Sequence, residues 1–200
     1  MLIILEGADK VGKSTLARDL EPDKILHATQ PTGDWFQEYA EPLEFYRPGA
    51  GLDVVCDRWH LGELVYGPLY RDQSLVGDEQ LAYLSLFLAS RGATIVLADC
   101  DEEVHAEVLR REPDGFLMPE DAEHVLQKFR TVALKNGAII VNPLAGRQGH
   151  AAARKKRLEF VRGIAAMEES DAAPLAHFPL YVGSPHPAIL LVGDRPGTLY

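Results

Sequence analysis

The chain has 200 residues, of which 46% are apolar, and carries a formal net charge of −10. This length is that of one domain with a full hydrophobic core and a short appendage. The acidic balance weighs against a broad nucleic-acid interface, and every apolar run falls short of the roughly 18 residues of a membrane span. A local basic site for a phosphate-bearing substrate, DNA included, stays open.

The cysteines and the N-terminus bear on the compartment. Cys56 and Cys100 fall at the ends of predicted strands, and Met1 leads directly into the first apolar run. We therefore expect no signal peptide and two free thiols in a reducing cytoplasm. The predicted localisation is cytoplasmic, with no membrane partner.

The first predicted element is a buried strand that leads into a glycine-rich loop. Residues 2–5 are Leu-Ile-Ile-Leu, an apolar run typical of a buried parallel strand, and a helix is predicted from Ser14 to Leu20. The sequence between them matches G-x-x-x-x-G-K-[ST], the phosphate-binding P-loop. Its predicted nucleotide-binding residues are Gly7, Ala8, Asp9, Lys10, Val11, Gly12, Lys13, Ser14 and Thr15.

The loop predicts a site for ATP and Mg²⁺. Gly7 and Gly12 allow a tight turn that brings backbone N–H groups close to a polyphosphate, and the following helix N-terminus adds a positive field. Lys13 is expected to reach the β- and γ-phosphates, and Ser14 is expected to ligate Mg²⁺.

The rest of the chain alternates strands and helices. Further strands are predicted at 25–28, 53–56, 94–98 and 138–141, and helices at 61–66, 78–90, 101–111, 119–134 and 151–169. This alternation implies a parallel sheet with right-handed crossovers and with ligands at the carboxyl ends of its strands. The predicted class is α/β, a three-layer P-loop NTPase fold with a five-stranded parallel sheet in the order 2-3-1-4-5, flanked by helices and followed by a C-terminal extension.

Local signals predict several element ends. Asp78 and Asp101 are the expected N-caps of their helices, and Gly67-Pro68 is expected to stop the helix at 61–66. The stretch 35–46 has helix-like spacing broken by Pro42.

A second polar set follows the third predicted strand. Asp57 and Arg58 are expected to project into the same crevice as the P-loop, Asp57 to orient Mg²⁺ or accept a proton and Arg58 to hold an acceptor phosphate bidentately. Trp59 and Tyr66 either stack on a base or pack in the core. His60 is expected to cap a helix or pack rather than approach the acceptor.

Residues 6–15 resemble the P-loop of thymidylate kinases, in which an acidic residue commonly follows the first glycine by two. Asp57-Arg58-Trp59 is similar to that family's Asp-Arg-aromatic motif, and Leu64–Gly67 resembles the Ala-Tyr-Gln-Gly run that follows it. The resemblance covers residues 1 to about 165. The resemblance implies a nucleotide substrate and a homodimer. Because the alternation of strands and helices is complete at residue 169, the P-loop kinase domain is predicted at 1–169.

The resemblance also implies individual roles. Asp9 would face the 3′-hydroxyl of the acceptor sugar, and Lys10 takes a position where some members carry an arginine that stabilises the transferring charge. Arg110 and Arg111 would clamp the γ-phosphate from the base of a lid at 111–118. The implied catalytic set is Asp9, Lys10, Lys13, Asp57, Arg58, Arg110 and Arg111. The substrate set is Asp9, Arg58, Trp59 and Tyr66, and the metal set is Ser14 and Asp57.

The acceptor side departs from the family pattern. Residues 29–33 lack the arginine of the family's Arg-Glu-Pro-Gly-like segment, and 35–47 do not match its apolar helix ending in Ala-Asn-Arg, with Phe45-Tyr46-Arg47 as a partial substitute. The predicted enzyme is a nucleotide kinase that phosphorylates a deoxynucleoside monophosphate, dTMP or a modified relative such as 5-hydroxymethyl-dUMP. Two alternatives stay open. One is a kinase for a modified base of the 5-hydroxymethyluracil type in DNA, or for a free nucleoside; the other is a non-catalytic nucleotide-binding interaction module.

The C-terminal extension is predicted at 170–200. Residues 171–187 are rich in proline and small residues, and residues 188–192 are strand-like. The extension is a wrapping arm, an edge strand or the start of a truncated second domain. Residues 193–197, Gly-Asp-Arg-Pro-Gly, loosely resemble the opening of uracil-DNA-glycosylase-like domains.

Overall fold

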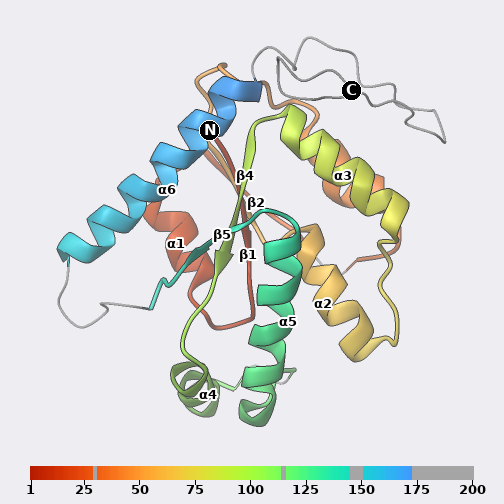
Figure 1. Cartoon of the computed structure of the whole chain (residues 1–200), viewed down its shortest axis with the longest axis vertical. Helices are drawn as coiled ribbons and strands as arrows, with labels where there is room; N and C mark the ends of the chain where they lie inside the picture. Colours follow the sequence, from red (N-terminus) through yellow and green to blue (C-terminus); the bar gives the residue numbers. More distant parts are fainter. Residues whose placement is uncertain (29–30, 114–115, 145–150, 173–200) are drawn as a thin grey trace.

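A five-stranded parallel sheet lies at the centre of the molecule, with the strand order β2-β3-β1-β4-β5 (Figure 1). The computed structural model describes residues 1–28, 31–113, 116–144 and 151–172. The strands are β1 (Leu2–Glu6), β2 (Lys24–His27), β3 (Val54–Asp57), β4 (Ala93–Ala98) and β5 (Ile139–Val141). The predicted α/β class and strand order are confirmed.

Helices follow the strands as the alternation predicts. The α-helices are α1 (Lys13–Asp19), α2 (His60–Tyr70), α3 (Asp78–Ser90), α4 (Glu102–Arg111), α5 (Ala122–Lys135) and α6 (Ala151–Ala172). Three short turns complete the described part: the π-helix η1 (Phe36–Ala40) and the 3₁₀-helices η2 (Glu41–Leu43) and η3 (Pro119–Asp121). None of the described helices is apolar enough over sufficient length to cross a membrane.

Helices cover both faces of the sheet, α1 and α6 on one face and α2, α3 and α5 on the other (Figure 1). Successive side chains of a strand point to opposite faces, and every residue of β1 is buried. Ile3 and Leu5 pack in one cluster with Leu16 of α1 and Val161 of α6, whereas Ile4 packs in another cluster with α3. The sheet is therefore buried on both sides, which leaves its carboxyl edge as the place for polar groups.

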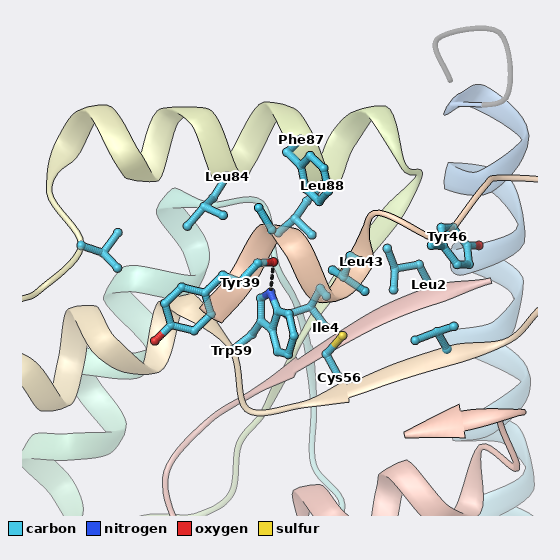
Figure 2. Close-up of a cluster of buried hydrophobic side chains, with 13 residues drawn as sticks. Leu2, Ile4, Tyr39, Leu43, Tyr46, Cys56, Trp59, Leu84, Phe87 and Leu88 are labelled. Atoms are coloured by element: carbon cyan, nitrogen blue, oxygen red, sulfur yellow. Dashed lines mark hydrogen bonds between the residues drawn. The ribbon is translucent and has the colours of Figure 1, made fainter. Parts of the chain in front are cut away.

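The core on the α3 side is rich in aromatic residues (Figure 2). Leu84 and Leu88 of α3 and Tyr39 of η1 lie over β1 and β3, and Trp59 packs edge-on against Tyr39 with ring centroids 5.8 Å apart. Burying each leucine side chain contributes about 2 kcal/mol to stability. This cluster holds the start of α2 against the sheet, and it thereby fixes the position of Arg58, the residue before Trp59.

The predicted stop of α2 at Gly67-Pro68 is wrong. The helix runs on to Tyr70, and the Arg71 N–H still donates to the Gly67 carbonyl at 2.8 Å. A Cβ at Gly67 would lie 2.6 Å from Glu63 Oε1 and 2.8 Å from the Gln73 carbonyl, so the following loop folds closely back on the helix. Pro68 has no backbone N–H, so the helix loses one hydrogen bond there. The packing of this loop on α2 offsets that loss.

Other element ends show which caps form. Asp101 caps α4 as predicted, because its Oδ1 accepts the N–H groups of Glu103 and Val104. Asp78 is not a cap: it is the first residue of α3, and the preceding Gly77 N–H donates to Gln80 Oε1. The stretch 35–46 forms η1 and η2 rather than an α-helix, with a proline in the first turn of η2.

The free thiols expected at Cys56 and Cys100 are confirmed, and both are buried. The predicted loop at 146–149 and the extension from 173 onwards, with its strand-like segment at 188–192, lie outside the described residues. Residues 29–30 and 114–115 of two predicted turns do so as well.

Candidate active site

The carboxyl edge of the sheet brings the predicted site residues together. β1 ends at Glu6 and runs into the P-loop, and the neighbouring β3 ends at Asp57, which pairs with Leu5 on one side and His27 of β2 on the other. Three strands far apart in sequence thus deliver a glycine-rich loop, a carboxylate and an imidazole to one place.

The P-loop backbone needs its glycines for two different reasons. Gly7 has φ 136°, and a Cβ there would lie only 2.2 Å from the Ala98 carbonyl oxygen of β4. Gly12 has φ 97° and forms the left-handed turn from which α1 starts. Between them Lys10 adopts φ 66° without being a glycine, which marks a strained position in the loop.

Lys13 folds over its own loop. Its Nζ donates to the carbonyls of Gly7 at 2.7 Å and Ala8 at 2.5 Å, and lies 3.7 Å from Asp9 Oδ1. The side chain is buried, and desolvation lowers its pKa from the ordinary lysine value, although neighbouring carboxylates favour the charged form. A buried cation at the centre of the loop is suited to an anionic ligand.

The two predicted metal residues lie in contact. Ser14 Oγ donates to Asp57 Oδ2 at 2.6 Å, and His27 Nδ1 lies 3.7 Å from the same carboxylate oxygen. The other oxygen, Asp57 Oδ1, is buried and has no hydrogen-bond partner among the described residues. A hydroxyl beside a buried carboxylate with a spare oxygen fits Mg²⁺, which prefers oxygen ligands and retains several waters.

Arg58 faces the P-loop. Its backbone is left-handed, with φ 69°, and its N–H donates to the Leu5 carbonyl at 3.0 Å. Its Nη2 lies 2.6 Å from Asp9 Oδ1, and the side chain is half exposed. The strained backbone therefore turns the guanidinium toward Asp9, one carboxylate away from Lys13.

Glu6 is a residue whose role the sequence reasoning missed. It is buried at the end of β1, and its two carboxyl oxygens accept the N–H groups of Leu61 at 2.8 Å and Gly62 at 3.2 Å in the first turn of α2. Desolvation by burial raises its pKa to about 7, against the opposing effect of these hydrogen bonds and of Lys13. The signal was a carboxylate that ends an otherwise wholly apolar strand.

His105 was missed as well. It is buried on α4, and its Nε2 lies 2.7 Å from the Asp9 carbonyl oxygen. Tyr66 of α2 contacts the same loop residue, because its hydroxyl accepts the Asp9 N–H at 3.0 Å. Its ring stacks on Tyr70 and packs edge-on against Phe129, so Tyr66 braces the loop.

Trp59 does not fit the base-stacking role. Its side chain is only 3% exposed, and its Nε1 donates to the Tyr39 carbonyl at 3.2 Å within the core (Figure 2). The packing expected for His60 is confirmed, since it is fully buried against Tyr39 and burial lowers its pKa to about 3. Both side chains point into the core because the cluster above β3 offers apolar contacts.

Three other predicted site residues form ion pairs with glutamates of α4 or just beyond it. Arg110 and Arg111 are exposed and form ion pairs with Glu107 of the same helix. Lys10 Nζ lies 3.5 Å from Glu112 Oε2, just beyond α4. These ion pairs, at partly or fully exposed positions, are weak.

The partial substitute at Phe45-Tyr46-Arg47 lies at the opposite end of the sheet. Tyr46 is buried in the cluster that contains Leu2, at the start of β1 (Figure 2), and Phe45 lies beneath the ammonium of Lys24, the first residue of β2. The segment is therefore wrongly placed to support an acceptor at the carboxyl edge.

Comparisons with known proteins place the chain in a family. A scan of protein-family models finds none that matches the chain. The crystal structure of YorR from Bacillus subtilis, in complex with phosphorylated GDP, has the same fold, with a TM-score of 0.63 and 23% identity over 81% of this chain and 96% of that chain. In sequence, the chain is 30% identical over 142 residues to the SPbeta prophage-derived uncharacterized protein YorR of Bacillus subtilis (strain 168), which covers 68% of this chain and 84% of the relative. At this identity and coverage, the chain belongs to the same family as the prophage protein YorR.

Proposed function

We propose that the protein is an ATP-dependent kinase that transfers a phosphoryl group to a deoxynucleoside monophosphate of the thymidylate type. The observation that carries this proposal is the row formed by Lys13, Asp9 and Arg58, in which one carboxylate lies 3.7 Å from the ammonium and 2.6 Å from the guanidinium. Two cations so close together are suited to hold the phosphates of a donor and of an acceptor side by side.

The donor half consists of the loop amides, Lys13 and the N-terminus of α1. These groups favour a polyphosphate, because N–H dipoles and a buried ammonium stabilise negative charge where water is excluded. The phosphorylated GDP bound to YorR supports a nucleotide ligand for this fold. A triphosphate would draw the Lys13 ammonium from the Gly7 and Ala8 carbonyls.

Ser14 and Asp57 would hold Mg²⁺, Ser14 directly and Asp57 through water. When bound, the ion neutralises charge on the transferring phosphates. The Ser14 hydroxyl is already oriented by its 2.6 Å hydrogen bond to Asp57, so the pair needs little rearrangement to accept a cation.

The acceptor half depends on an exchange of partners. An acceptor phosphate would replace the Asp9 carboxylate on Arg58, since a guanidinium binds either group through two parallel N–H donors. Asp9 would then be available to a sugar hydroxyl. Lys10, with Arg110 or Arg111 after these leave Glu107, would stabilise the moving phosphoryl group.

A transfer assay tests this proposal. γ-Labelled ATP and GTP are each offered with dTMP, 5-hydroxymethyl-dUMP, the other deoxynucleoside monophosphates, free nucleosides and DNA containing 5-hydroxymethyluracil. We expect label to move to a pyrimidine deoxynucleoside monophosphate, and to do so only with Mg²⁺ and intact Lys13. Label found only in DNA or only in nucleosides would replace the proposed acceptor. Nucleotide binding without any transfer would contradict a kinase and leave a binding module.

A further inference from the structure

The P-loop is fastened to α4 through a buried histidine that the proposed chemistry does not use. His105 Nε2 lies 2.7 Å from the Asp9 carbonyl oxygen, although the two residues are 96 positions apart. Since a carbonyl oxygen only accepts, Nε2 carries the proton and donates. His105 shares the buried face of α4 with Leu109, one turn further on, so its ring is held by packing.

His105 contacts the peptide between Asp9 and Lys10, whose observed orientation is one that the backbone of a lysine disfavours. The Asp9 carbonyl belongs to the peptide that joins Asp9 to Lys10, where φ is 66°. A flip of this peptide would turn φ of Lys10 by about 180° into the extended region that lysine prefers. A tertiary contact must therefore hold the observed orientation, and His105 is the group that contacts the carbonyl.

The orientation matters to an anion. The carbonyl and the N–H of a trans peptide point in opposite directions, so anchoring the Asp9 oxygen to α4 directs the Lys10 N–H away from α4. A flipped peptide would present an oxygen in place of that N–H, and an oxygen repels a phosphate. Tyr66 holds the preceding peptide in the same way, by accepting the Asp9 N–H at 3.0 Å.

We propose that His105 is a positioning residue of the P-loop, whose hydrogen bond to the Asp9 carbonyl keeps the Lys10 N–H directed at a nucleoside triphosphate. The ligand in this statement rests on the proposed function. The loop orientation rests on the contact between His105 and Asp9 alone. Desolvation lowers the pKa of His105 from the ordinary histidine value, which keeps the ring neutral with its Nε2 proton in place.

Two variants of His105 separate the hydrogen bond from the bulk of the side chain. His105→Leu keeps an apolar side chain and removes the donor, whereas His105→Gln keeps an N–H donor at a similar distance from the backbone. We expect the dissociation constant of Mg·ATP, measured by calorimetric titration, to rise about tenfold in His105→Leu and to recover most of that loss in His105→Gln. The matched control is His124→Leu, at an exposed position on α5, for which we expect no change.

A purely structural histidine would behave differently. Both His105 variants would then melt at a lower temperature, while the folded proteins would bind Mg·ATP as the wild type does. Wild-type affinity in folded His105→Leu, or an equal loss in His105→Gln, would overturn the inference and leave the proposed kinase function untouched.

A second measurement needs no nucleotide. Lys10→Gly removes the strain at φ 66°, because glycine adopts left-handed backbone freely. With lysine at position 10, the peptide can flip once the His105 donor is lost. The flip relieves the backbone strain at Lys10 and so partly compensates for the lost hydrogen bond. With glycine at position 10 that relief is absent, so we expect His105→Leu to lower the melting temperature further in the Lys10→Gly background.

Additive effects of the two substitutions would overturn the inference. This double-mutant cycle of His105→Leu and Lys10→Gly is read from melting temperatures, so it can be measured even if the wild type binds no nucleoside triphosphate. That result would contradict the proposed function, and the non-additivity would still decide whether His105 holds the peptide.

Discussion

The donor and acceptor halves of the candidate site are built in opposite ways. The proposed donor half is one continuous segment, residues 7–15, and would act mainly through backbone N–H groups and one buried lysine. The acceptor half centres on Arg58, a half-exposed side chain positioned by a left-handed backbone between β3 and α2. A backbone site is specified by local turn residues, whereas a side-chain site depends on what packs around it.

The difference extends to the supports of each half. The loop is held by hydrogen bonds from Tyr66 and His105 to both sides of Asp9. Arg58 is held by the core beneath it, where Trp59 and His60 are buried, and by Glu6, which ties β1 to the first turn of α2. Glu6 thus lies at the joint of the two halves, so the same carboxyl group affects both.

The largest expected effect lies in the donor half. Lys13→Met should lower phosphoryl transfer by about 10²- to 10³-fold, because a preorganised cation at the transferring phosphates is lost. The unfolding free energy should change by less than about 1 kcal/mol, since removal of a buried charge offsets two lost hydrogen bonds. Transfer assays and urea titrations measure the two effects, with Lys128→Met on the exposed face of α5 as control. Transfer that survives in Lys13→Met would break the assignment of the donor half.

Glu6, which lies at the joint of the two halves, should make the free energy of unfolding depend on pH. Burial raises the pKa of Glu6 from 4.5 to about 7, so between these values the folded protein binds a proton that the unfolded chain has released. The contribution of Glu6 is therefore fully present below pH 4.5 and is lost as the pH rises to about 7. Relative to Glu6→Gln, the wild type should lose on the order of 3 kcal/mol across this window.

Urea titrations of the wild type and Glu6→Gln from pH 4.5 to pH 8 measure that difference. The contributions of the other carboxylates cancel, because both proteins contain them. A constant difference between the two proteins across this range would show that Glu6 does not change protonation on folding.

The acceptor half should respond to Arg58→Lys. The lysine keeps the charge but loses the planar pair of donors, so the KM of the acceptor should rise about 30-fold, on the order of 2 kcal/mol. The KM of ATP should stay nearly unchanged, because Lys13 and the loop amides remain. Steady-state kinetics in both substrates measure the split, with Arg162→Lys of α6, on the other face of the sheet, as control. Equal effects on both KM values would abolish the division into halves.

The smallest effect concerns the core below Arg58. Trp59→Phe removes the hydrogen bond to the Tyr39 carbonyl and leaves a small void, so the unfolding free energy should fall by about 1–2 kcal/mol. The KM of the acceptor should not change, because the ring is buried. Trp35→Phe, at a partly buried aromatic contact with Tyr83, serves as a comparison without that hydrogen bond. A raised acceptor KM without loss of stability would restore the base-stacking role.

Local features of the sequence were enough to predict the sheet and the glycine-rich turn after its first strand. These features act through neighbouring residues, so they can be recognised from the sequence alone. They are the apolar run at 2–5, the glycines at 7 and 12 and the alternation of strands with helices. The cap at Asp101 belongs to the same class, because its side chain contacts residues two and three positions away.

Contacts between distant elements decided the rest. The Gly67-Pro68 stop failed because a loop packs back on α2, and Trp59 turned into a core that η1 and α3 supply. Phe45 and Arg47 were close to the expected site in sequence order but lie near the other end of the sheet.

By itself, the sequence determined a parallel α/β sheet with a glycine-rich loop after its first strand, because backbone conformation and apolar patterning are local properties. The motif at Asp57-Arg58 already led us to expect Arg58 beside the loop. Only the tertiary structure decided that its partner there is the Asp9 carboxylate, that Glu6 ties β1 to α2 and that His105 reaches the loop. These pairings depend on which buried side chains meet across the fold, and 96 positions separate His105 from the carbonyl that it contacts.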